Sequence, residues 1–438
     1  MEPTCGETEG LATEKSASTA RQRTARAVAW LLLAAATAKF CYRGPWRAFQ
    51  SSTDLALYYA SARAWVEGSN PYDPENLRAV AARAGGAPAT LLRNAISPPV
   101  TLVPLAPLTL LSWREAQAVW LAANLLLTAG MCWLLVRLAS LRPTSTGGLL
   151  LLAMVLALAP LHTGLKHGQM ALASTALLVG AVGAQWGGRG VGAGVLLALA
   201  GVFKPQLAAA FGLYWICRRR WRAVLTAAVV VGAVTLVALL RLHWAEVAWW
   251  PQWRANIEAC FYGGDCDHTV AGQAHIFIHL QHPLYAILGS RAAATWLGWA
   301  VTAVLAAAGV AAWRRTPETP GRELTVLAFL GVICLLPVYH IFYDAVVLVL
   351  PLCWAVRALG TRQKRWAIAT IVLALPFLVS GAAALHVLAK TGRVPAHWAS
   401  SWWWRALLLP HQPYLLLAMG IVLALALRSE AKEAATRL

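Results

Sequence analysis

Residues 223–241 read AVLTAAVVVGAVTLVALLR and contain no charged side chain before Arg241. A membrane-spanning α-helix needs about 20 predominantly apolar residues, so this stretch can cross a bilayer as one helix. Its apolar residues run continuously instead of alternating with polar ones, which excludes the strand of a membrane β-barrel. The stretch therefore predicts a helical membrane protein.

The composition of the whole chain of 438 residues agrees with this prediction. Hydrophobic residues make up 59% and charged residues 13%, against about 45–50% and about 25% in soluble domains. Apolar runs recur along the chain, several of them shorter and interrupted by Gly or Pro, and we expect twelve spans. The expected spans are 27–42, 115–136, 147–162, 169–185, 190–203, 205–217, 223–241, 292–313, 323–339, 344–358, 366–386 and 413–428.

The net charge of +19 is distributed as a membrane-topology signal. Cytoplasmic loops carry an excess of Lys and Arg, and the basic clusters fall on one side if the N-terminus is cytoplasmic. This assignment requires that Ala274–Leu288 does not cross, so we expect a re-entrant or interfacial segment there. The clusters include Arg21 to Arg26, Arg137 with Arg142, Arg218 to Arg222, Arg314 with Arg315, and Arg362 to Arg365. Orientation thus explains the charge, and we expect no nucleic-acid partner.

The orientation divides the chain into one membrane domain and two cytoplasmic tails. Residues 1–26 are rich in Glu, Thr, Ser and Ala and are expected to be disordered. They lack the basic-then-apolar order of a cleaved signal, so the first span should stay as an anchor. The transmembrane domain is expected over 27–428 and the second tail over 429–438. The expected outer loops are 43–112, 243–291 and 387–412, and function should reside in them.

Asp54 is the acid best placed for chemistry. Only 18 residues are Asp or Glu, so acidic candidates outside the tails and loops are few. Asp54 begins a helix-like stretch that ends near Gly68, and it lies beside Tyr58 and Tyr59. A carboxylate there could take a proton from an acceptor hydroxyl. Thr53 or Asp54 could equally cap this helix, and both interpretations stay open.

Lys204 lies between the short apolar segments 190–203 and 205–217. Half-length segments broken at a proline are how membrane proteins build polar sites within the bilayer. A lysine there costs a few kcal/mol unless it is paired, so a partner is expected. A phosphate at the membrane interface fits that role, although Lys204 could also be a snorkelling lysine at a helix end.

Two further polar turns lie between apolar spans. Lys166, His167 and Gln169 form one on the outer side. His340 and Asp344 belong to the other and are four residues apart, which places them on one helical face. This pair could be a proton relay or a local hydrogen bond.

The second outer loop contains histidines that could suggest a metal site and cysteines that could form a disulfide. His275, His279 and His282 imitate metal spacing, but no carboxylate or thiol accompanies them in a zinc pattern, so we expect no metal. Cys260 and Cys266 flank a Gly-Gly turn, where an oxidising compartment would permit a disulfide. Sequence alone does not fix the geometry that a disulfide requires, so its formation is left open.

The order and spacing of several motifs resemble those of glycosyltransferase family 87. The motifs are Asp54–Tyr59, Gly68–Asp73, the Pro98–Pro107 loop, His167-Gly168-Gln169, the segment from Gly192 to Pro205, and Arg218–Arg222. They cover residues 50–225 well and 330–352 more loosely. Members of this family are polyprenyl-phosphate-sugar-dependent membrane enzymes of the C-type superfamily, typified by mannosyltransferases of mycobacterial phosphatidylinositol mannosides.

The resemblance implies an all-α C-type glycosyltransferase fold of about twelve transmembrane helices. Its extracytoplasmic loops would form the active site at the outer face of a bacterial plasma membrane, among membrane lipids. A polyprenyl-phosphate sugar would be the donor, and a lipid or a cell-envelope glycan the acceptor. The last motif, Tyr339–Asp344, differs from the version expected of a mannosyltransferase. The transferred sugar, mannose or another hexose or pentose, and the acceptor therefore stay open.

The resemblance also implies residue roles. Asp54 would deprotonate the acceptor hydroxyl for in-line attack with inversion, while fixed cations would stabilise charge on the phosphate leaving group. The cation candidates are Lys204 and His340, followed by Lys166, His167 and Arg93. The expected substrate contacts are Tyr58, Tyr59, Asp73, Gln169 and Asp344. A donor with one phosphate needs Mg²⁺ less than a diphosphate does, so no cofactor is expected.

A non-enzymatic transporter of lipid or polysaccharide, similar to a flippase, is the alternative. Such a protein would also need many spans, interfacial aromatic residues and a basic cavity. It would have no use for a carboxylate directed at a hydroxyl outside the bilayer, and it often contains inverted repeats, which this sequence does not reveal. The two functions can therefore be distinguished at Asp54, since the enzyme needs its carboxylate and the transporter does not.

Overall fold

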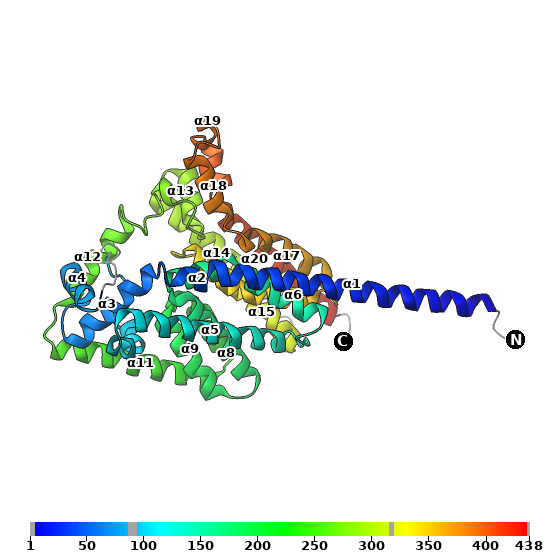
Figure 1. Ribbon diagram of the computed structural model, residues 1–438, viewed down its shortest axis with the longest axis horizontal. Helices are drawn as coiled ribbons and strands as arrows, with labels where there is room; N and C mark the ends of the chain where they lie inside the picture. Colours follow the sequence, from blue (N-terminus) through cyan, green and yellow to red (C-terminus); the bar gives the residue numbers. More distant parts are fainter. Residues whose placement is uncertain (1–4, 86–93, 315–318, 436–438) are drawn as a thin grey trace.

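The computed structural model describes residues 5–85, 94–314 and 319–435, which form helices and connecting turns (Figure 1). Within these ranges the only β-type pairing is an isolated antiparallel bridge between Phe277 and Ile341. The elements are α1 (Cys5–Arg43), α2 (Pro45–Ala48), α3 (Thr53–Glu67), α4 (Pro74–Arg83), η2 (Pro99–Leu110), α5 (Trp113–Leu138), α6 (Thr146–Ala157), α7 (Ala159–His167), α8 (Met170–Trp186), α9 (Gly190–Phe203), α10 (Pro205–Cys217), α11 (Trp221–Trp244), α12 (Trp249–Phe261), η3 (Ala271–Gln273), α13 (Gln281–Leu288), α14 (Arg291–Arg314), α15 (Pro320–Ile333), η4 (Phe342–Leu348), α16 (Val349–Ala358), α17 (Lys364–Leu378), α18 (Gly381–Lys390), α19 (Ala396–Ala399), η5 (Trp404–Leu408) and α20 (His411–Ala435). The predicted all-α membrane fold is confirmed.

Among the described helices, five are long and apolar enough to cross a membrane alone: α1, α5, α11, α14 and α20. Two bent pairs, α6 with α7 and α17 with α18, raise the number to seven if each pair is one span. The bends are 45° and 41°, respectively. Several other apolar helices, such as α8 and α9, are shorter. The structure thus supports a polytopic protein, and the number twelve stays a prediction.

The chain breaks where the sequence predicts it, between α9 and α10. Lys204 is the C-cap of α9 and the N-cap of α10, and Pro205 is the first residue of α10. Proline suits that position because its missing N–H has no intrahelical acceptor there. The predicted half-length helices and the lysine between them are confirmed.

Helix α1 begins earlier than expected and continues from Cys5 to Arg43. It therefore includes most of the segment 1–26, which the sequence led us to expect as a disordered tail. Ala, Glu and Arg have high helix propensity and are frequent in this segment, which favours continuation of the helix. Figure 1 shows α1 projecting from one end of the bundle, with the C-terminus near that same end.

Lys39 of α1 connects the two bent helix pairs. Its ammonium group donates hydrogen bonds to the carbonyl oxygen of Ala157, at 3.1 Å, and to that of Leu378. Ala157 is the last residue of α6 and Leu378 is the last residue of α17. Carbonyls at a helix end have no intrahelical partner, so one lysine satisfies an exposed acceptor at both breaks.

Close packing between α9 and α11 depends on a small residue at position 194. A Cβ on Gly194 would lie 2.4 Å from the carbonyl oxygen of Ala223 and 2.6 Å from the Cβ of Thr226. Small residues at such positions allow two helices to approach closely. Helix α11 is otherwise little covered, since 11% of its apolar window is buried.

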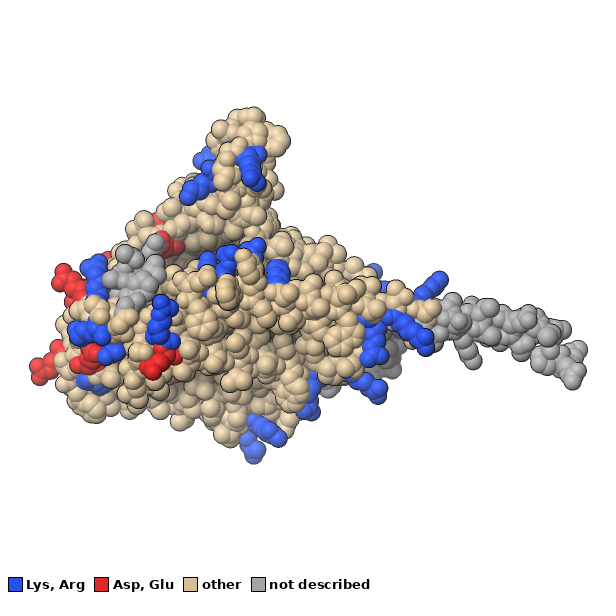
Figure 2. Space-filling model, in the orientation of Figure 1, with Lys and Arg blue, Asp and Glu red and all other residues tan. Residues whose placement is uncertain are grey.

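Helices α3, α4 and α12 gather at the end of the bundle away from the N-terminus, whereas α13, α18 and α19 project to one side (Figure 1). On the face drawn in Figure 2, most of the visible acidic side chains lie at the α3 and α4 end, and the charged side chains coloured toward the opposite end are Lys and Arg. A small core that includes Leu55, Tyr59 and Tyr72 fixes α3 against α4 and η2. This arrangement gives the outer segment 43–112 a fixed shape.

The second outer segment is held by covalent and ionic links. A disulfide joins Cys260 and Cys266, which settles the question that the sequence left open. Arg291 contacts both carboxylate oxygens of Asp267 at 2.9 Å. Helix α13 has only eight residues, too few to cross a bilayer. This is consistent with the expected re-entrant or interfacial position of 274–288.

Candidate active site

Asp54 lies in the first turn of α3, but its carboxylate does not cap that helix. Ser52 is the capping residue, and it makes no side-chain capping hydrogen bond. The Asp54 carboxylate instead accepts hydrogen bonds from the Gln169 side-chain amide and from the Thr53 hydroxyl, the latter at 3.4 Å. The capping interpretation of this acid therefore does not hold.

Gln169 is the centre of the site. Its Nε2 donates to Asp54 and to the hydroxyl of Tyr343, at 2.8 Å in the second case. Its Oε1 accepts from the hydroxyl of Tyr58 at 3.2 Å. The side chain is buried, so these bonds hold it in one orientation. Three segments distant in sequence thus meet at one amide.

Gly168 allows the turn before Gln169 to touch α3. Its φ of +69° is in the left-handed region, which glycine adopts without steric cost. A Cβ at this position would lie 2.6 Å from the Cβ of Leu55. The carbonyl oxygen of Gly168 also accepts from Nε1 of Trp120 at 3.0 Å. The motif His167-Gly168-Gln169 is therefore a close contact between α7, α8 and α3.

Lys204 and Asp344 form an ion pair beside this centre. The Lys204 Nζ lies 3.2 Å from Oδ1 of Asp344, and 5.2 Å from the centre of the Tyr343 ring. His340 donates from Nδ1 to the other carboxylate oxygen at 3.0 Å. A polar chain, made of two hydrogen bonds from Gln169 and one cation–π contact with Tyr343, therefore connects Asp54 with Lys204.

The segment 274–280 fixes the position of His340 and Asp344. The backbone N–H of Ile278 donates to the carbonyl of His340 at 3.2 Å, and that of Phe342 donates to the carbonyl of Ile276 at 2.8 Å. The segment before α13 therefore closes over the turn that carries the ion pair. His340 itself is completely buried.

Thr53 links Asp54 to His167. The Thr53 hydroxyl lies 2.8 Å from Nδ1 of His167 and donates to Asp54. A hydroxyl carries one proton, so Nδ1 of His167 must be the donor in this arrangement. Lys166 contributes its backbone carbonyl, which accepts from the N–H of Ser52 at 2.9 Å. His167 thus contacts the site through Thr53.

The two carboxylates differ in exposure. Asp54 is partly accessible, whereas the Asp344 side chain is 2% exposed. Burial is the main cause that raises the pKa of Tyr58, and the nearby Asp54 charge adds to it. Tyr58 therefore stays a neutral hydrogen-bond donor at physiological pH. Of the two acids, Asp54 is the more exposed one.

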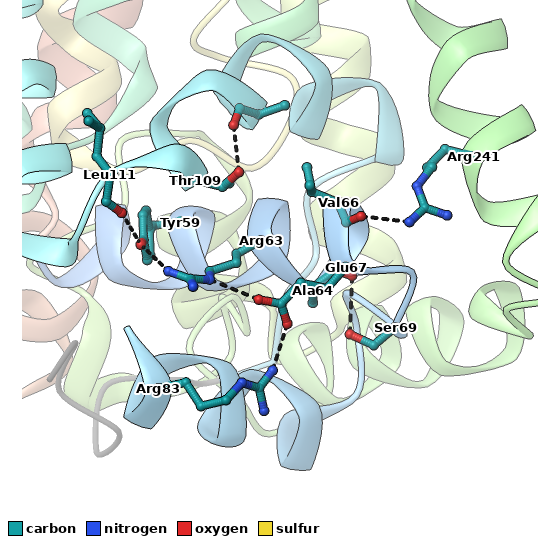
Figure 3. A network of polar contacts seen from close by, with 11 residues as sticks. Tyr59, Arg63, Ala64, Val66, Glu67, Ser69, Arg83, Thr109, Leu111 and Arg241 are labelled. Carbon is teal, nitrogen blue, oxygen red and sulfur yellow. Dashed lines mark hydrogen bonds and ion pairs between the residues drawn. The ribbon is translucent and has the colours of Figure 1, made fainter. Parts of the chain in front are cut away.

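Two expected residues, Tyr59 and Asp73, are not part of this cluster. The Tyr59 hydroxyl donates to the carbonyl of Leu111 at 2.7 Å and accepts from Arg63 at 2.9 Å (Figure 3). Asp73 caps α4 by accepting from the N–H of Glu75. Arg93 lies outside the described residues.

Figure 3 shows the polar contacts that connect α3 to its neighbouring helices. Glu67 pairs with Arg63 at 2.9 Å and with Arg83 of α4 at 2.6 Å. Arg241 of α11 donates to the carbonyl of Val66 at the end of α3. These contacts join α3 to α4 and α11, so this face is structural and the opposite side of α3 carries Asp54.

The histidines of the second outer segment have separate partners. His275 stacks on His386 with ring centres 4.0 Å apart. His279 bonds to Gln281, and His282 lies 2.6 Å from the carbonyl oxygen of His268. Within the described residues, no group of three or more His, Cys, Asp or Glu side chains is placed to hold a metal ion.

Tyr343 and Thr53 are site residues for which the sequence predicts no role in the chemistry. Tyr343 lies within the motif Tyr339–Asp344, and Thr53, a candidate cap only, directly precedes Asp54. Neither residue type carries charge, and neither has a spacing that would mark it. Their roles become visible only when residues 53, 167, 169 and 343 are brought together in space.

Comparison with known protein families gives one match. The model described as glycosyltransferase family 87 matches residues 95–338, more than half of the chain. The matched region includes Lys166, His167, Gln169 and Lys204, whereas Asp54 lies before it. Comparison with curated proteins and with solved structures gave no match.

Proposed function

We propose, from the premise that this chain belongs to glycosyltransferase family 87, that it transfers a sugar from a polyprenyl-phosphate donor to a hydroxyl group of a lipid or cell-envelope glycan. The family and the apolar helices make it a membrane glycosyltransferase. The observation that carries the finer proposal is the polar chain from Asp54 through Gln169 and Tyr343 to Lys204. It sets a reachable carboxylate and a fixed cation at two ends of one site.

In this mechanism Asp54 is the general base. Its carboxylate takes the proton of the acceptor hydroxyl while the hydroxyl oxygen forms a bond to the anomeric carbon of the sugar. The bond from that carbon to the phosphate oxygen breaks, and polyprenyl phosphate leaves from the opposite face. The configuration at the anomeric carbon is therefore inverted. Gln169 and Thr53 hold the Asp54 carboxylate in place by donating to it.

Lys204 is the cation that meets the donor phosphate. Negative charge develops on the phosphate oxygen as the bond breaks, and a fixed cation stabilises that charge in the transition state. The Lys204 side chain is 12% exposed, against 2% for Asp344, so the lysine is the accessible member of the pair. His340 is buried behind Asp344, and we assign it to positioning Asp344. His167 and Lys166 border the site near Asp54.

The site faces the extracytoplasmic side of a bacterial plasma membrane in this proposal. The positive-inside distribution of Lys and Arg supports this orientation. The disulfide between Cys260 and Cys266, in the segment that leads to the site, suits an oxidising compartment. Mannose is the first sugar to test because of the resemblance to mannosyltransferases, and other hexoses or pentoses follow.

The test is transfer of labelled mannose from polyprenyl-phosphate mannose to extracted membrane lipids by the purified protein. Asp54→Asn should lower the rate by about 10²–10⁴-fold, as expected for loss of a general base. Binding of polyprenyl phosphate should stay unchanged, because Asn keeps the shape of the side chain. Asp73→Asn is the matched control and should transfer sugar at the normal rate. Normal turnover by Asp54→Asn would refute the assignment.

The same preparation distinguishes an enzyme from a transporter. A flippase-like protein reconstituted in vesicles would move labelled polyprenyl phosphate between leaflets and would transfer no sugar from any donor. Transfer that requires Asp54 would exclude that alternative. The carboxylate held by Gln169 favours the enzyme, because lipid movement has no step that removes a hydroxyl proton.

A further inference from the structure

A second polar site lies at the other end of the bundle. A cavity of about 700 Å³ opens there between the α8–α9 turn, the α10–α11 turn and the start of α15. Among the residues that line it are Trp186, Arg219, Arg220, Trp221, Arg222 and Glu323. Such a volume falls within the range typical of small-molecule sites.

The cavity is separate from the Asp54 site. Helix α9 begins with Gly190 at the cavity and ends with Phe203, next to Lys204. At a rise of 1.5 Å per residue, its 14 residues place the two ends about 20 Å apart. The catalytic proposal therefore does not account for the cavity.

The charge of the cavity favours an anion. Glu323 is the one acid among its lining residues, and its charge interacts with those of Arg218 and Arg220. Arg219 and Arg222 have no ion-pair partner among the described residues. Two guanidinium groups thus remain without a countercharge. Guanidinium binds phosphate through paired hydrogen bonds of matching geometry.

Two helix N-termini add to this positive character. Helices α9 and α11 both begin at the cavity, and neither has a side-chain capping hydrogen bond. The first N–H groups of a helix have no intrahelical acceptor, and the helix dipole places partial positive charge there. A Cβ on Gly190 would lie 3.2 Å from the Cβ of Arg222, so the two starts are close together.

Arg219 occupies a backbone conformation that would suit glycine. Its φ is +54°, in the left-handed region, where a residue with a Cβ is disfavoured. Glycine at this position would relax the turn and remove only the side chain. An arginine here therefore does not improve the backbone of the turn, so its side chain serves a role outside the fold of this turn, to which an anionic ligand would add.

The surroundings indicate a ligand that comes from the membrane. Trp221 borders the cavity and is 51% exposed, as is usual for tryptophan at the level of lipid headgroups. It begins α11, whose apolar surface is almost uncovered by other helices. Gln185 also lines the cavity, and its side-chain oxygen is buried with no hydrogen-bond partner among the described residues. That oxygen could accept from a hydroxyl group.

We propose that this cavity binds the phosphate group of an anionic phospholipid headgroup. Arg219 and Arg222 contact the phosphate oxygens, and the N-termini of α9 and α11 face the same charge. The acyl chains extend along α11. The bound lipid would connect α8, α9, α11 and α15 at the end of the bundle opposite Asp54.

The test uses native mass spectrometry of the full protein released from mixed vesicles of phosphatidylglycerol and phosphatidylcholine. The wild type should retain phosphatidylglycerol in preference to phosphatidylcholine. The double variant Arg219→Gly/Arg222→Gln should retain it at least tenfold less, because each charge-assisted hydrogen bond contributes about one order of magnitude. Arg142→Gln, an exposed arginine of the α5–α6 loop, is the control and should behave as the wild type.

Thermal unfolding in lipid-free detergent tests whether a variant that loses lipid retention is still folded. The single variant Arg219→Gly should unfold no earlier than the wild type, and it should still lose lipid retention. A second arm adds inorganic phosphate to the delipidated wild type: stabilisation at millimolar phosphate would show that free phosphate also fits, and its absence would show that the lipid is required. Equal retention of phosphatidylglycerol by the wild type and the double variant would overturn the proposal, as would equal retention of the two lipids by the wild type.

Discussion

The ammonium nitrogen of Lys204 lies 3.2 Å from Oδ1 of Asp344, and both side chains are largely buried. The lysine at the break between two short helices therefore has a protein partner, as its cost within a membrane requires. His340 holds the second oxygen of the same carboxylate. A phosphate that approaches Lys204 would meet a cation already oriented by Asp344.

Asp344→Asn should destabilise the protein. Removal of one member of a buried ion pair leaves an uncompensated charge and costs about 3–5 kcal/mol. We expect a lower unfolding temperature, and a larger rise on addition of polyprenyl phosphate than in the wild type, because the phosphate replaces the lost countercharge. The double variant Lys204→Met/Asp344→Asn is the control. The pairing argument fails if the single variant is as stable as the double variant.

Gln169→Glu should change the pH dependence of sugar transfer. It would place a second carboxylate beside Asp54, and like charges disfavour ionisation of both groups. The acidic limb of the pH–rate profile should move to higher pH. Gln169→Leu should lower the turnover number without that movement, because it removes only the orientation of Asp54. Identical profiles for wild type and Gln169→Glu would show that Gln169 does not act on Asp54.

Gly168→Ala should disrupt the contact between the α7–α8 turn and α3. Gly168 and Gly188 both have positive φ, +69° and +74°, but only Gly168 would place a Cβ against another residue, Leu55. Each substitution should cost about 1–2 kcal/mol for the backbone conformation. Gly168→Ala should cost more and should also reduce activity. Equal unfolding temperatures for the two variants would contradict the close packing at Leu55.

Acidification should loosen the second outer segment between pH 6.5 and pH 4. Burial lowers the pKa of His275 and of His282 to about 4; the neighbouring His386 adds to this effect at His275, whereas the hydrogen bond with the His268 carbonyl opposes it at His282. The unfolded segment therefore binds protons in this window that the folded segment does not, so stability falls as the pH falls. Hydrogen exchange over residues 268–289 should speed up in this range. His275→Gln/His282→Gln should weaken the response.

Asp267 should not contribute to the loss of stability between pH 6.5 and pH 4. Burial opposes its ionisation, but hydrogen bonds from Thr269, Gly263 and Arg291 outweigh this effect and lower its pKa to about 2. Its stabilising effect is complete above the unfolded pKa near 4 and is lost only as the pH falls toward 2. A response of the wild type that persists unchanged without the two histidines would contradict the assignment.

Membrane orientation can be tested with cysteines introduced one at a time at Thr144 and Arg254, in a background where Cys5, Cys41 and Cys217 are replaced by Ser. A membrane-impermeant thiol reagent added to intact cells should label Arg254→Cys and spare Thr144→Cys. Both should react after the membrane is opened. Labelling of both positions in intact cells would refute the proposed sidedness.

Much of the helical framework follows from the sequence. Long apolar runs such as that of α11 predict their own conformation, because a bilayer leaves no other partner for the backbone. The break at Lys204 is equally local, since Pro205 determines it. The bend between α6 and α7 was not foreseen, although Pro160 lies in the first turn of α7, directly after the break, and a proline interrupts the hydrogen bonds of a continuous helix.

The candidate site could be predicted only in part. Asp54, Gln169 and Lys204 are recognisable by charge, motif or position. Their connection through Tyr343 depends on packing between segments far apart in the chain, which no local pattern specifies. Tyr59 was expected to contact the substrate but does not belong to the site. Its neighbour Tyr58 bonds to Gln169 in the site, whereas the Tyr59 hydroxyl bonds to the carbonyl of Leu111.

Lys39 gives the bundle a shared pivot. One ammonium group donates to the last carbonyls of both α6 and α17, so a displacement of Lys39 would disturb both breaks at once. The two broken helices therefore share one hydrogen-bond donor, which belongs to α1. Helix α7, which ends at the Gln169 turn, continues from one of these breaks. Lys39 is thus a point in the membrane bundle from which a change can reach both broken helices, one of which leads to the candidate site.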